Sequence, residues 1–215
     1  RCSSSIVRKF GEKALPEGRL RVRLAGSAGQ SLGAFAVQGL LLDVFGDAND
    51  YVGKGLSGAT IQLRPRRDAQ LEASENTIIG NTCLYGATSG RLYAAGQAGV
   101  RFGVRNSGAE AVVEGCGANG CEYMTGGRVA ILGPVGDNFG AGMTGGVAWI
   151  WDPDKRFERV ANPDSIDWYT LADMHEEHIG RFHLMLEMHA ERTGSKRAQK
   201  LLENWEQTLQ ETWLI

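Results

Sequence analysis

Short runs of apolar, β-prone residues recur along most of the chain, and a glycine precedes nearly every one. The glycines in question are Gly39, Gly58, Gly90, Gly108, Gly127 and Gly146. Most neighbours in this series lie about 18–19 residues apart, and the one long interval contains a further run, Thr77–Ile79. A repeat of this length, with one or two short strands and glycine turns, is typical of one coil of a β-solenoid. We therefore predict an all-β parallel β-helix of about seven stacked coils.

Two segments flank the repeats and show different patterns. Within residues 1–25, the run Leu20–Leu24 alternates apolar and basic residues, which predicts a strand with its apolar side chains on one face. The turn residues Asp152–Asp154 end the repeats, and glycine becomes rare after them. We therefore predict two domains, a β-helix over residues 1–152 and a helical tail over residues 153–215 that packs on it.

The tail has the spacing of two amphipathic helices that form a hairpin. Apolar residues and histidines recur at helical spacing in the first, and Thr193–Ser195 supplies a break and an N-cap. The first set is Leu171, Met174, His178, Ile179, Phe182, Leu186 and His189, and the second is Ala198, Leu201, Leu202, Trp205, Leu209 and Trp213.

Such a hairpin has a physical use in a solenoid. The last coil would otherwise present an open strand edge and an uncovered core, which pair readily with other chains. We expect Phe182, Leu186, Trp205 and Trp213 to cover that end. The alternative is that the tail serves dimerisation or docks a partner.

Composition sets limits on the function. The chain has 215 residues, 30 of them glycine, and a net charge of −2, which argues against binding to nucleic acid or an anionic membrane surface. An apolar stretch long enough for a membrane span is missing from the sequence. The first residues include neither an initiator Met nor a signal core, so we expect a piece of a longer chain or a processed one. Four scattered cysteines fit a reducing, cytoplasmic compartment.

Three segments match the G-x-G-x-x-G pattern of dinucleotide-binding loops. They are Gly53–Gly58, Gly115–Gly120 and Gly140–Gly145. A true fingerprint opens a helix whose N-terminus holds the pyrophosphate, whereas β-prone residues follow all three. Lys54 has the wrong spacing for a phosphate loop, and Gly55 stands where a magnesium-binding hydroxyl is needed. We interpret these segments as turns of the solenoid.

The remaining titratable clusters also favour structural interpretations. Cys116 and Cys121 are spaced too widely for a zinc pair, and with Cys83 they suit small buried positions. His175 and His178 lack the spacing of a metalloprotease motif. With His183 they are expected on the surface or at a boundary. A spatial triad of Ser, His and Asp stays open, because its members need not be close in sequence.

Five asparagines fall in the expected turns. Asparagine tolerates the left-handed conformation, and stacked asparagines can bond to successive coils, so we expect these to be structural. They are Asn49, Asn81, Asn106, Asn119 and Asn138. We predict no catalytic, cofactor-binding or metal-binding residue in this chain.

Several strings along the chain are specific enough to compare with known families. The strings are Gly26–Phe35, Gly46–Gly58, Gly86–Gly90, Val104–Gly108, Val113–Gly115, Gly120–Gly127, Asn138–Gly146, His189–Ser195 and Asn204–Trp205. Together they closely resemble the C-terminal glycine-repeat (GXGXG) domain of the glutamate synthase large subunit. The resemblance covers essentially the whole chain, including the tail.

The resemblance implies a right-handed parallel β-helix within a multidomain flavoenzyme. That enzyme takes the amide nitrogen of glutamine with an N-terminal cysteine and passes ammonia to 2-oxoglutarate. It then reduces the adduct to glutamate with FMN and an iron–sulfur cluster. Cys2 does not match that nucleophile, and the chain lacks the clustered cysteines that iron–sulfur ligation needs. The cofactors are therefore expected in other parts of the parent enzyme.

The resulting prediction is a structural, non-catalytic domain, while the parent is an oxidoreductase. Its expected partners are the FMN-binding and amidotransferase domains, whose separation it would hold. Polar, turn-located residues around Asn49–Tyr51 and Arg101–Asn106 are the expected interface. One alternative is a stand-alone β-helix subunit of an N-methylglutamate synthase or formylmethanofuran dehydrogenase type. Another is an independent enzyme with a cleft on the β-helix side, as in polysaccharide lyases.

Overall fold

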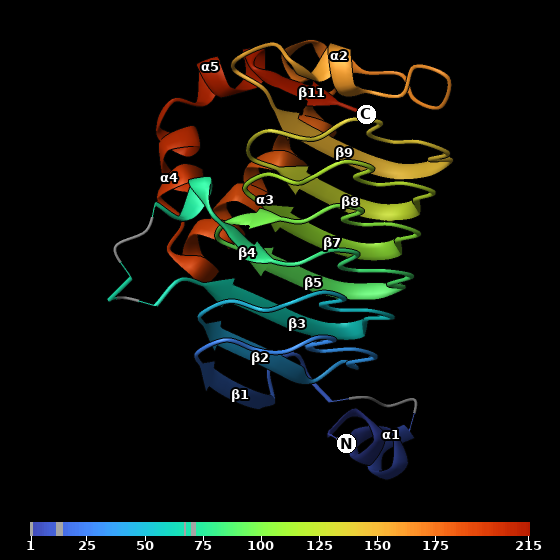
Figure 1. Cartoon of the computed structure of the whole chain (residues 1–215), viewed down its shortest axis with the longest axis vertical. Coiled ribbons are helices and arrows are strands. Elements are labelled where there is room, and N and C mark those ends of the chain that lie inside the picture. Colours follow the sequence, from blue (N-terminus) through green and yellow to red (C-terminus); the bar gives the residue numbers. More distant parts are fainter. Residues whose placement is uncertain (1, 12–14, 67, 70–71) are drawn as a thin grey trace.

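The protein is described by a computed structural model that covers residues 2–11, 15–66, 68–69 and 72–215. A stack of coils forms the body, and helices lie along one side of it (Figure 1). The main sheet has nine strands in the order β1-β2-β3-β5-β7-β8-β9-β11-β10, and β4 and β6 pair in a second, two-stranded sheet. The fold is a parallel β-solenoid of about 7 turns, as the glycine spacing predicted.

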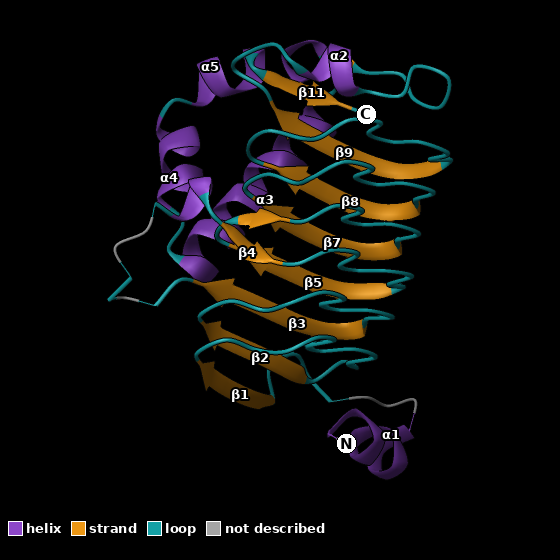
Figure 2. Cartoon of the chain, viewed as in Figure 1, coloured by secondary structure: helices purple, strands orange, loops and turns teal. Residues whose placement is uncertain are grey.

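The elements follow the chain in a regular order, and Figure 2 distinguishes the strands from the helices. The strands are β1 (Leu20–Ala25), β2 (Leu40–Phe45), β3 (Ser57–Arg64), β4 (Thr77–Ile79), β5 (Ser89–Ala94), β6 (Gln97–Ala98), β7 (Ser107–Val113), β8 (Thr125–Ile131), β9 (Gly145–Trp151), β10 (Tyr169–Thr170) and β11 (Thr212–Leu214). The α-helices are α1 (Cys2–Phe10), α2 (Phe157–Val160), α3 (Glu176–Thr193), α4 (Lys196–Glu203) and α5 (Trp205–Gln210), with 3-10 turns η2 (Ala73–Glu75) and η3 (Leu171–Asp173).

From β1 to β9, successive main-sheet strands pair in parallel, so equivalent residues of successive coils lie in rows. The central row that points into the solenoid is apolar throughout the stack. It consists of Leu42, Ile61, Leu92, Ala111, Val129 and Ala148. Each of these side chains is at least nine-tenths buried. Stacked coils thus bury together a core that one coil alone would leave in water.

The glycine-rich turns share one backbone pattern, in which three alternate residues take positive φ. The triplets are Ser31/Gly33/Phe35, Tyr51/Gly53/Gly55, Thr82/Leu84/Gly86, Arg101/Gly103/Arg105, Asn119/Cys121/Tyr123 and Asn138/Gly140/Gly142. Glycine takes this conformation readily, whereas other residues pay a penalty. The repeated G-x-G therefore supplies left-handed positions for a turn.

The two ends of the solenoid differ. At the C-terminal end, β11 pairs antiparallel with β9, and β10 pairs with β11. Trp213, predicted on the second helix, lies in β11, so that part of the prediction is wrong. At the other end, β1 pairs only with β2 among the described residues, and Leu20 and Leu24 are more than a third exposed.

Helices α3 to α5 cover the outward face of the main sheet, whereas α2 and β11 lie at the C-terminal end of the stack (Figure 1). Phe182 and Leu186 of α3 pack on Val112, Ala130 and Trp149 from three successive coils. The expectation that residues of the tail cover the open edge is therefore confirmed for Trp213, which lies in β11 on that edge, and is wrong for Phe182, Leu186 and Trp205. The predicted break between the helices is confirmed. Gly194 ends α3 in the left-handed conformation, and the Ser195 hydroxyl accepts the N–H of Ala198 to start α4.

Candidate functional site

The outward face of the main sheet, together with the helices packed on it, holds most of the buried polar residues in the described part of the chain. Its central row changes character from one end of the stack to the other. In order from β1 to β9 the row reads Arg23, Asp43, Gln62, Tyr93, Val112, Ala130 and Trp149. At the β1 end, the charged side chains form ion pairs with one another. At the β9 end, α3 covers the apolar side chains.

Asp43 is the hub of the charged end. Its side chain has 0% exposure and accepts hydrogen bonds from the side chains of Gln62 at 2.7 Å and Arg64 at 2.7 Å. Arg21 and Arg23 bond to its other oxygen. Burial opposes ionisation of Asp43, but the hydrogen bonds from Gln62 and Arg21 and the charge of Arg64 outweigh it. The pKa of Asp43 therefore lies below its ordinary value.

Glu114 is the hub of a second buried cluster, where the tail meets β7. Its Oε1 accepts the hydroxyl of Ser195 and lies 3.3 Å from His189 Nε2. The Thr193 hydroxyl donates to the carbonyl of His189 at 2.6 Å. Serine, histidine and glutamate are together here, but the serine donates directly to the carboxylate. That arrangement ties the α3–α4 junction to the sheet, and it differs from a triad in which histidine accepts the serine proton.

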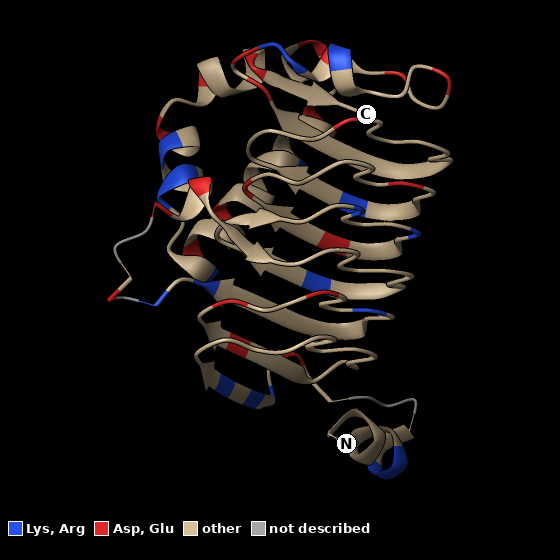
Figure 3. Cartoon of the chain, viewed as in Figure 1, with Lys and Arg blue, Asp and Glu red and all other residues tan. Residues whose placement is uncertain are grey.

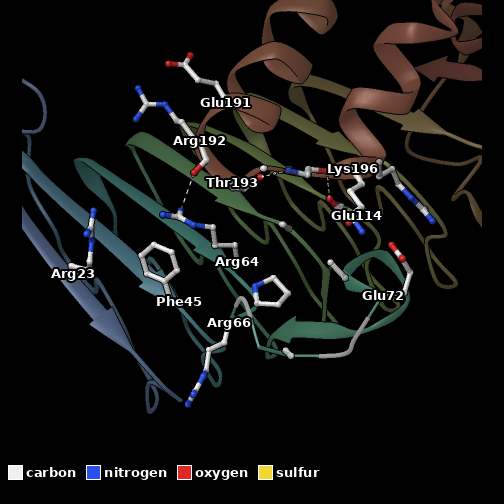
Figure 4. A pocket seen from close by; sticks show the side chains of 17 residues that line it. Arg23, Phe45, Arg64, Arg66, Glu72, Glu114, Glu191, Arg192, Thr193 and Lys196 are labelled. Carbon is white, nitrogen blue, oxygen red and sulfur yellow. Dashed lines mark hydrogen bonds between the residues drawn. The ribbon is translucent and has the colours of Figure 1, made fainter.

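A cleft of about 640 Å³ lies between the α3–α4 junction and the segment that follows β3 (Figure 4). Its charged lining residues are Arg23, Arg64, Arg66, Glu72, Glu114, Glu191, Arg192, Lys196 and Arg197. Most of its cations are already bonded within the chain. Arg64 also donates to the carbonyl of Arg192 at 2.9 Å, and Arg197 donates to the carbonyl of Leu132 at 2.9 Å. The cleft is thus a polar junction that joins the tail to the coils.

The three G-x-G-x-x-G segments are turns that lead toward strands. Gly53–Gly58 runs into β3, Gly115–Gly120 precedes β8, and Gly140–Gly145 runs into β9. The interpretation as solenoid turns is confirmed. Close packing adds a second demand for glycine, since a Cβ at Gly55 would lie 2.5 Å from the ring of Phe35.

The cysteines and histidines lie where the sequence placed them. Cys83, Cys116 and Cys121 are buried, and burial raises the pKa of Cys83 and of Cys116 to about 12. These thiols stay protonated at neutral pH, so they are weak nucleophiles. Within the described ranges, three or more metal-ligating side chains do not gather at any point. His175 is exposed, and His178 and His183 are partly exposed.

The turn asparagines bond along the stack. Asn81 Oδ1 accepts the Val100 N–H of the next coil at 2.9 Å. Asn138 donates to Asn119 at 2.8 Å and accepts from Asn162 at 2.7 Å, which makes a ladder over three levels. Asn49 Oδ1 accepts from the neighbouring N–H of Asp50, and Asn106 caps its own turn. Bonding between coils is therefore confirmed for Asn81, Asn119 and Asn138, whereas the side chains of Asn49 and Asn106 bond within their own turns.

The proposed interface stretches lie on one edge of the stack but only partly at the surface. Tyr51 is 37% exposed, and the side chains of Arg101 and Arg105 are also exposed. Asn106 is fully buried, so including it as an interface residue is wrong. Sequence reasoning did not identify Asp43 or Glu114. The signal was present for Asp43, an acid within the otherwise apolar strand Leu40–Phe45 that alternation places on the outward face.

None of the helices in the described ranges is both long and apolar enough to cross a bilayer. Comparison with known proteins finds one family model, described as the GXGXG motif, that matches residues 1–215.

Three relatives illustrate the similarity. The glutamate synthase (NADPH) large chain of Azospirillum brasilense is 54% identical over 215 residues, which is 100% of this chain and 14% of the relative. The Bacillus subtilis (strain 168) protein of the same name is 48% identical over 207 residues, 96% of this chain and 14% of the relative. The ferredoxin-dependent glutamate synthase 2 of Synechocystis is 46% identical over 214 residues, 99% of this chain and 14% of the relative. The chain spans only a small part of the length of each.

Proposed function

Because the chain belongs to the GXGXG-motif family, we propose that it is a non-catalytic domain of a glutamate synthase that positions the other domains of that enzyme. The observation that carries the proposal is 54% identity, over the full chain, to one segment of a glutamate synthase large chain. The cytoplasm is the proposed compartment. FMN and the iron–sulfur cluster are proposed to bind elsewhere in the parent enzyme, as is the cysteine that attacks glutamine.

Rigidity is the property of this fold that supports a positioning role. The rows of buried apolar residues and the parallel strand pairs run without interruption from β1 to β9. Asp43 and Glu114 add buried polar ties between the coils and between the coils and the tail. Neighbouring strands of a sheet lie about 4.8 Å apart, so the number of coils sets the length of the body in fixed steps.

Fixed separation matters chemically if ammonia released at one site must reach a second site without escaping. Misplacement of reacting groups by about 1 Å can cost on the order of 100-fold in rate. In the proposed enzyme, this chain would supply none of the reacting groups. Its residues would instead hold the glutamine-cleaving and reducing domains in register.

A change in the length of the solenoid tests this role in the full-length enzyme. A second copy of residues 39–57, inserted before Gly58, adds one complete coil between β2 and β3. We expect glutamine hydrolysis and ammonia-dependent glutamate formation to survive. Glutamine-dependent glutamate formation should fall at least tenfold, because the domains would be displaced by about 4.8 Å.

The matched control inserts a Gly/Ser segment of equal length between Asp68 and Ala69, which adds mass without adding a coil. This variant should keep the glutamine-dependent rate. The retained ammonia-dependent rate shows that the enzyme has folded. An unchanged glutamine-dependent rate in the extra-coil variant would refute the positioning role.

A further inference from the structure

One edge of the solenoid carries a row of exposed aromatic rings. They come from the glycine-rich turns that precede the main-sheet strands, along the right-hand edge of Figure 1. Phe35 is 61% exposed, Tyr51 37%, Tyr85 38% and Tyr123 49%. Single exposed aromatic residues are ordinary, but here four lie on one edge, with Phe35, Tyr51 and Tyr85 on successive levels and Tyr123 two levels beyond Tyr85. We call these four residues, with Lys54 and Arg105, the aromatic stripe.

Two rings of the stripe are held in place by the next coil along the chain. Backbone hydrogen bonds put Phe35 in the same row as Gly55, and Tyr123 in the same row as Gly142. A Cβ at Gly55 would lie 2.5 Å from the Phe35 ring, so the ring rests against bare backbone. The glycine at position 142 gives the Tyr123 ring the same platform. These two rings are therefore fixed before any partner arrives, which lowers the entropic cost of binding.

The backbone under the stripe is also in an unfavourable conformation. Phe35, Arg105 and Tyr123 have φ between 53° and 55°, in a row where other coils place glycine. Tyr51 has φ of 61° in a row without glycine. A left-handed non-glycine residue costs about 1 kcal/mol or more, and such strain is concentrated at functional sites. Large side chains are thus kept at positions where a smaller residue would fold more easily.

The cations of the stripe indicate the charge of a partner. Lys54 Nζ lies 5.6 Å from the ring centre of Tyr51 and 6.0 Å from that of Tyr85. Arg105 lies over Tyr123 at 5.5 Å. Within the described part of the chain, neither cation has a carboxylate within 4.0 Å, although Arg101 beside them pairs with Glu122 at 3.0 Å. The centres of protein–protein interfaces are enriched in arginine and aromatic side chains, and the stripe has both.

We propose that the aromatic stripe docks an acidic surface of another domain of the same enzyme, with carboxylates that pair with Lys54 and Arg105. The proposal rests on the proposed function, because it names the partner's chemistry for a domain that positions others. It also narrows the interface expected from the sequence. Tyr51 and Arg105 belong to the stripe, while the buried Asn106 does not.

Hydroxyl-radical footprinting of the full-length enzyme tests the docking. The oxidation rate of each tyrosine in the native enzyme is divided by its rate in urea. A free stripe would give Tyr123 about half of its denatured rate, in line with 49% exposure. A docked stripe should lower the ratios of Tyr51, Tyr85 and Tyr123 about tenfold, because interface centres exclude water. Ratios that match the exposures of this isolated fold would overturn the proposal.

Charge reversal tests the acidic character of the partner. The double variant Lys54→Glu/Arg105→Glu should raise the oxidation of Tyr51 and Tyr123 toward the rates of a free surface. Arg105→Lys should leave them protected. Arg159→Glu/Lys200→Glu, at two exposed positions away from the stripe, is the matched control. Continued protection of the tyrosines in the charge-reversed stripe would overturn the acidic partner.

The two tests fail independently of each other. If the tyrosines of the stripe are protected but an added coil leaves the glutamine-dependent rate unchanged, the positioning role is refuted and the docking surface stands. If an added coil lowers the glutamine-dependent rate while the tyrosines of the stripe are oxidised as on a free surface, the docking surface is refuted and the positioning role stands.

Discussion

The two halves of the outward sheet face use the same backbone and bury their side chains in opposite ways. Over β1–β3 the central row is Arg23, Asp43 and Gln62, and over β8–β9 it is Ala130 and Trp149. Figure 3 shows charged positions on the lowest strands of the stack. Polar groups in the first half satisfy one another within the sheet. Apolar groups in the second half need a separate layer, and α3 provides it.

The difference shows what each half requires of the rest of the chain. A buried carboxylate is stable only when enough donors surround it, so the charged half depends on a matched set of side chains. An apolar row depends on area and shape, which any well-packed helix can supply. The first half is therefore sensitive to single charge changes, and the second to cavities.

Trp149→Ala should have the largest effect. Trp149 is 1% exposed and stacks on Phe182 at 6.2 Å, so truncation leaves a large cavity under α3. We expect a loss of about 3–5 kcal/mol in the free energy of unfolding, measured by urea denaturation. Trp149→Phe is the control and should cost much less, since the indole N–H has no partner within the described residues. A small loss for Trp149→Ala would mean that α3 does not depend on this contact.

Asp43→Asn should have the next largest effect. It removes the charge that holds three arginines while leaving the side chain's shape. We expect a loss of roughly 2–4 kcal/mol, less than for a fully buried pair because Arg21 and Arg23 are about half exposed. The control is Asp68→Asn, whose partner Arg66 is well exposed, and it should show no measurable change in the urea midpoint. Equal effects at Asp43 and Asp68 would remove the distinction between the halves.

Glu114→Gln tests the boundary between the halves and should cost roughly 1–2 kcal/mol. Glutamine keeps an acceptor for Ser195 but loses the charge and places an amide beside His189. We expect hydrogen exchange to accelerate over residues 193–198, because those residues bond around this carboxylate. The same acceleration with Ser195→Ala would locate the effect in this hydrogen bond. Unchanged exchange in both variants would contradict it.

A change of pH near neutrality should have the smallest effect on stability. Its dependence on pH distinguishes the charged half of the outward face from the apolar half. The pKa of Asp43 is lower in the folded than in the unfolded chain, so its contribution is fully present above the unfolded value near pH 4. That contribution is lost as the pH falls through the folded pKa. The stability difference between wild type and Asp43→Asn should therefore be constant from pH 7 to about pH 5 and shrink below pH 4. The cost of Trp149→Ala should stay constant, and a parallel decline would contradict the comparison.

The sequence predicted the solenoid well because one interval repeats. Glycine spacing located the coils, and the alternation in Leu20–Leu24 correctly predicted a strand. The triplets of left-handed residues were not predictable in full. Leu84 and Cys121 occupy positions where other coils have glycine, and nothing in their chemistry favours positive φ.

Long-range pairing limited the prediction of the tail. Trp213 fits the helical spacing of the preceding residues, but its backbone bonds with β9 outweigh that local preference. Glu114 and Ser195 are 81 residues apart, so their contact leaves no signal in local spacing. The division into two domains at residue 152 stays a prediction, and the same holds for the absence of catalytic, cofactor-binding and metal-binding residues.

The change from charged to apolar residues along the outward row has a consequence during synthesis, because each coil remains uncovered for a different time before the helices follow. Chains grow at about 5–20 residues per second, so roughly 8–30 s pass between the synthesis of Asp43 and that of the α3–α4 junction. Only about 2–7 s separate the synthesis of Trp149 from that of Phe182. The first coils stay uncovered longest, and their outward side chains are polar. The coils with apolar outward side chains are synthesised last. We expect a nascent chain stalled after β9 to be the form most prone to aggregate.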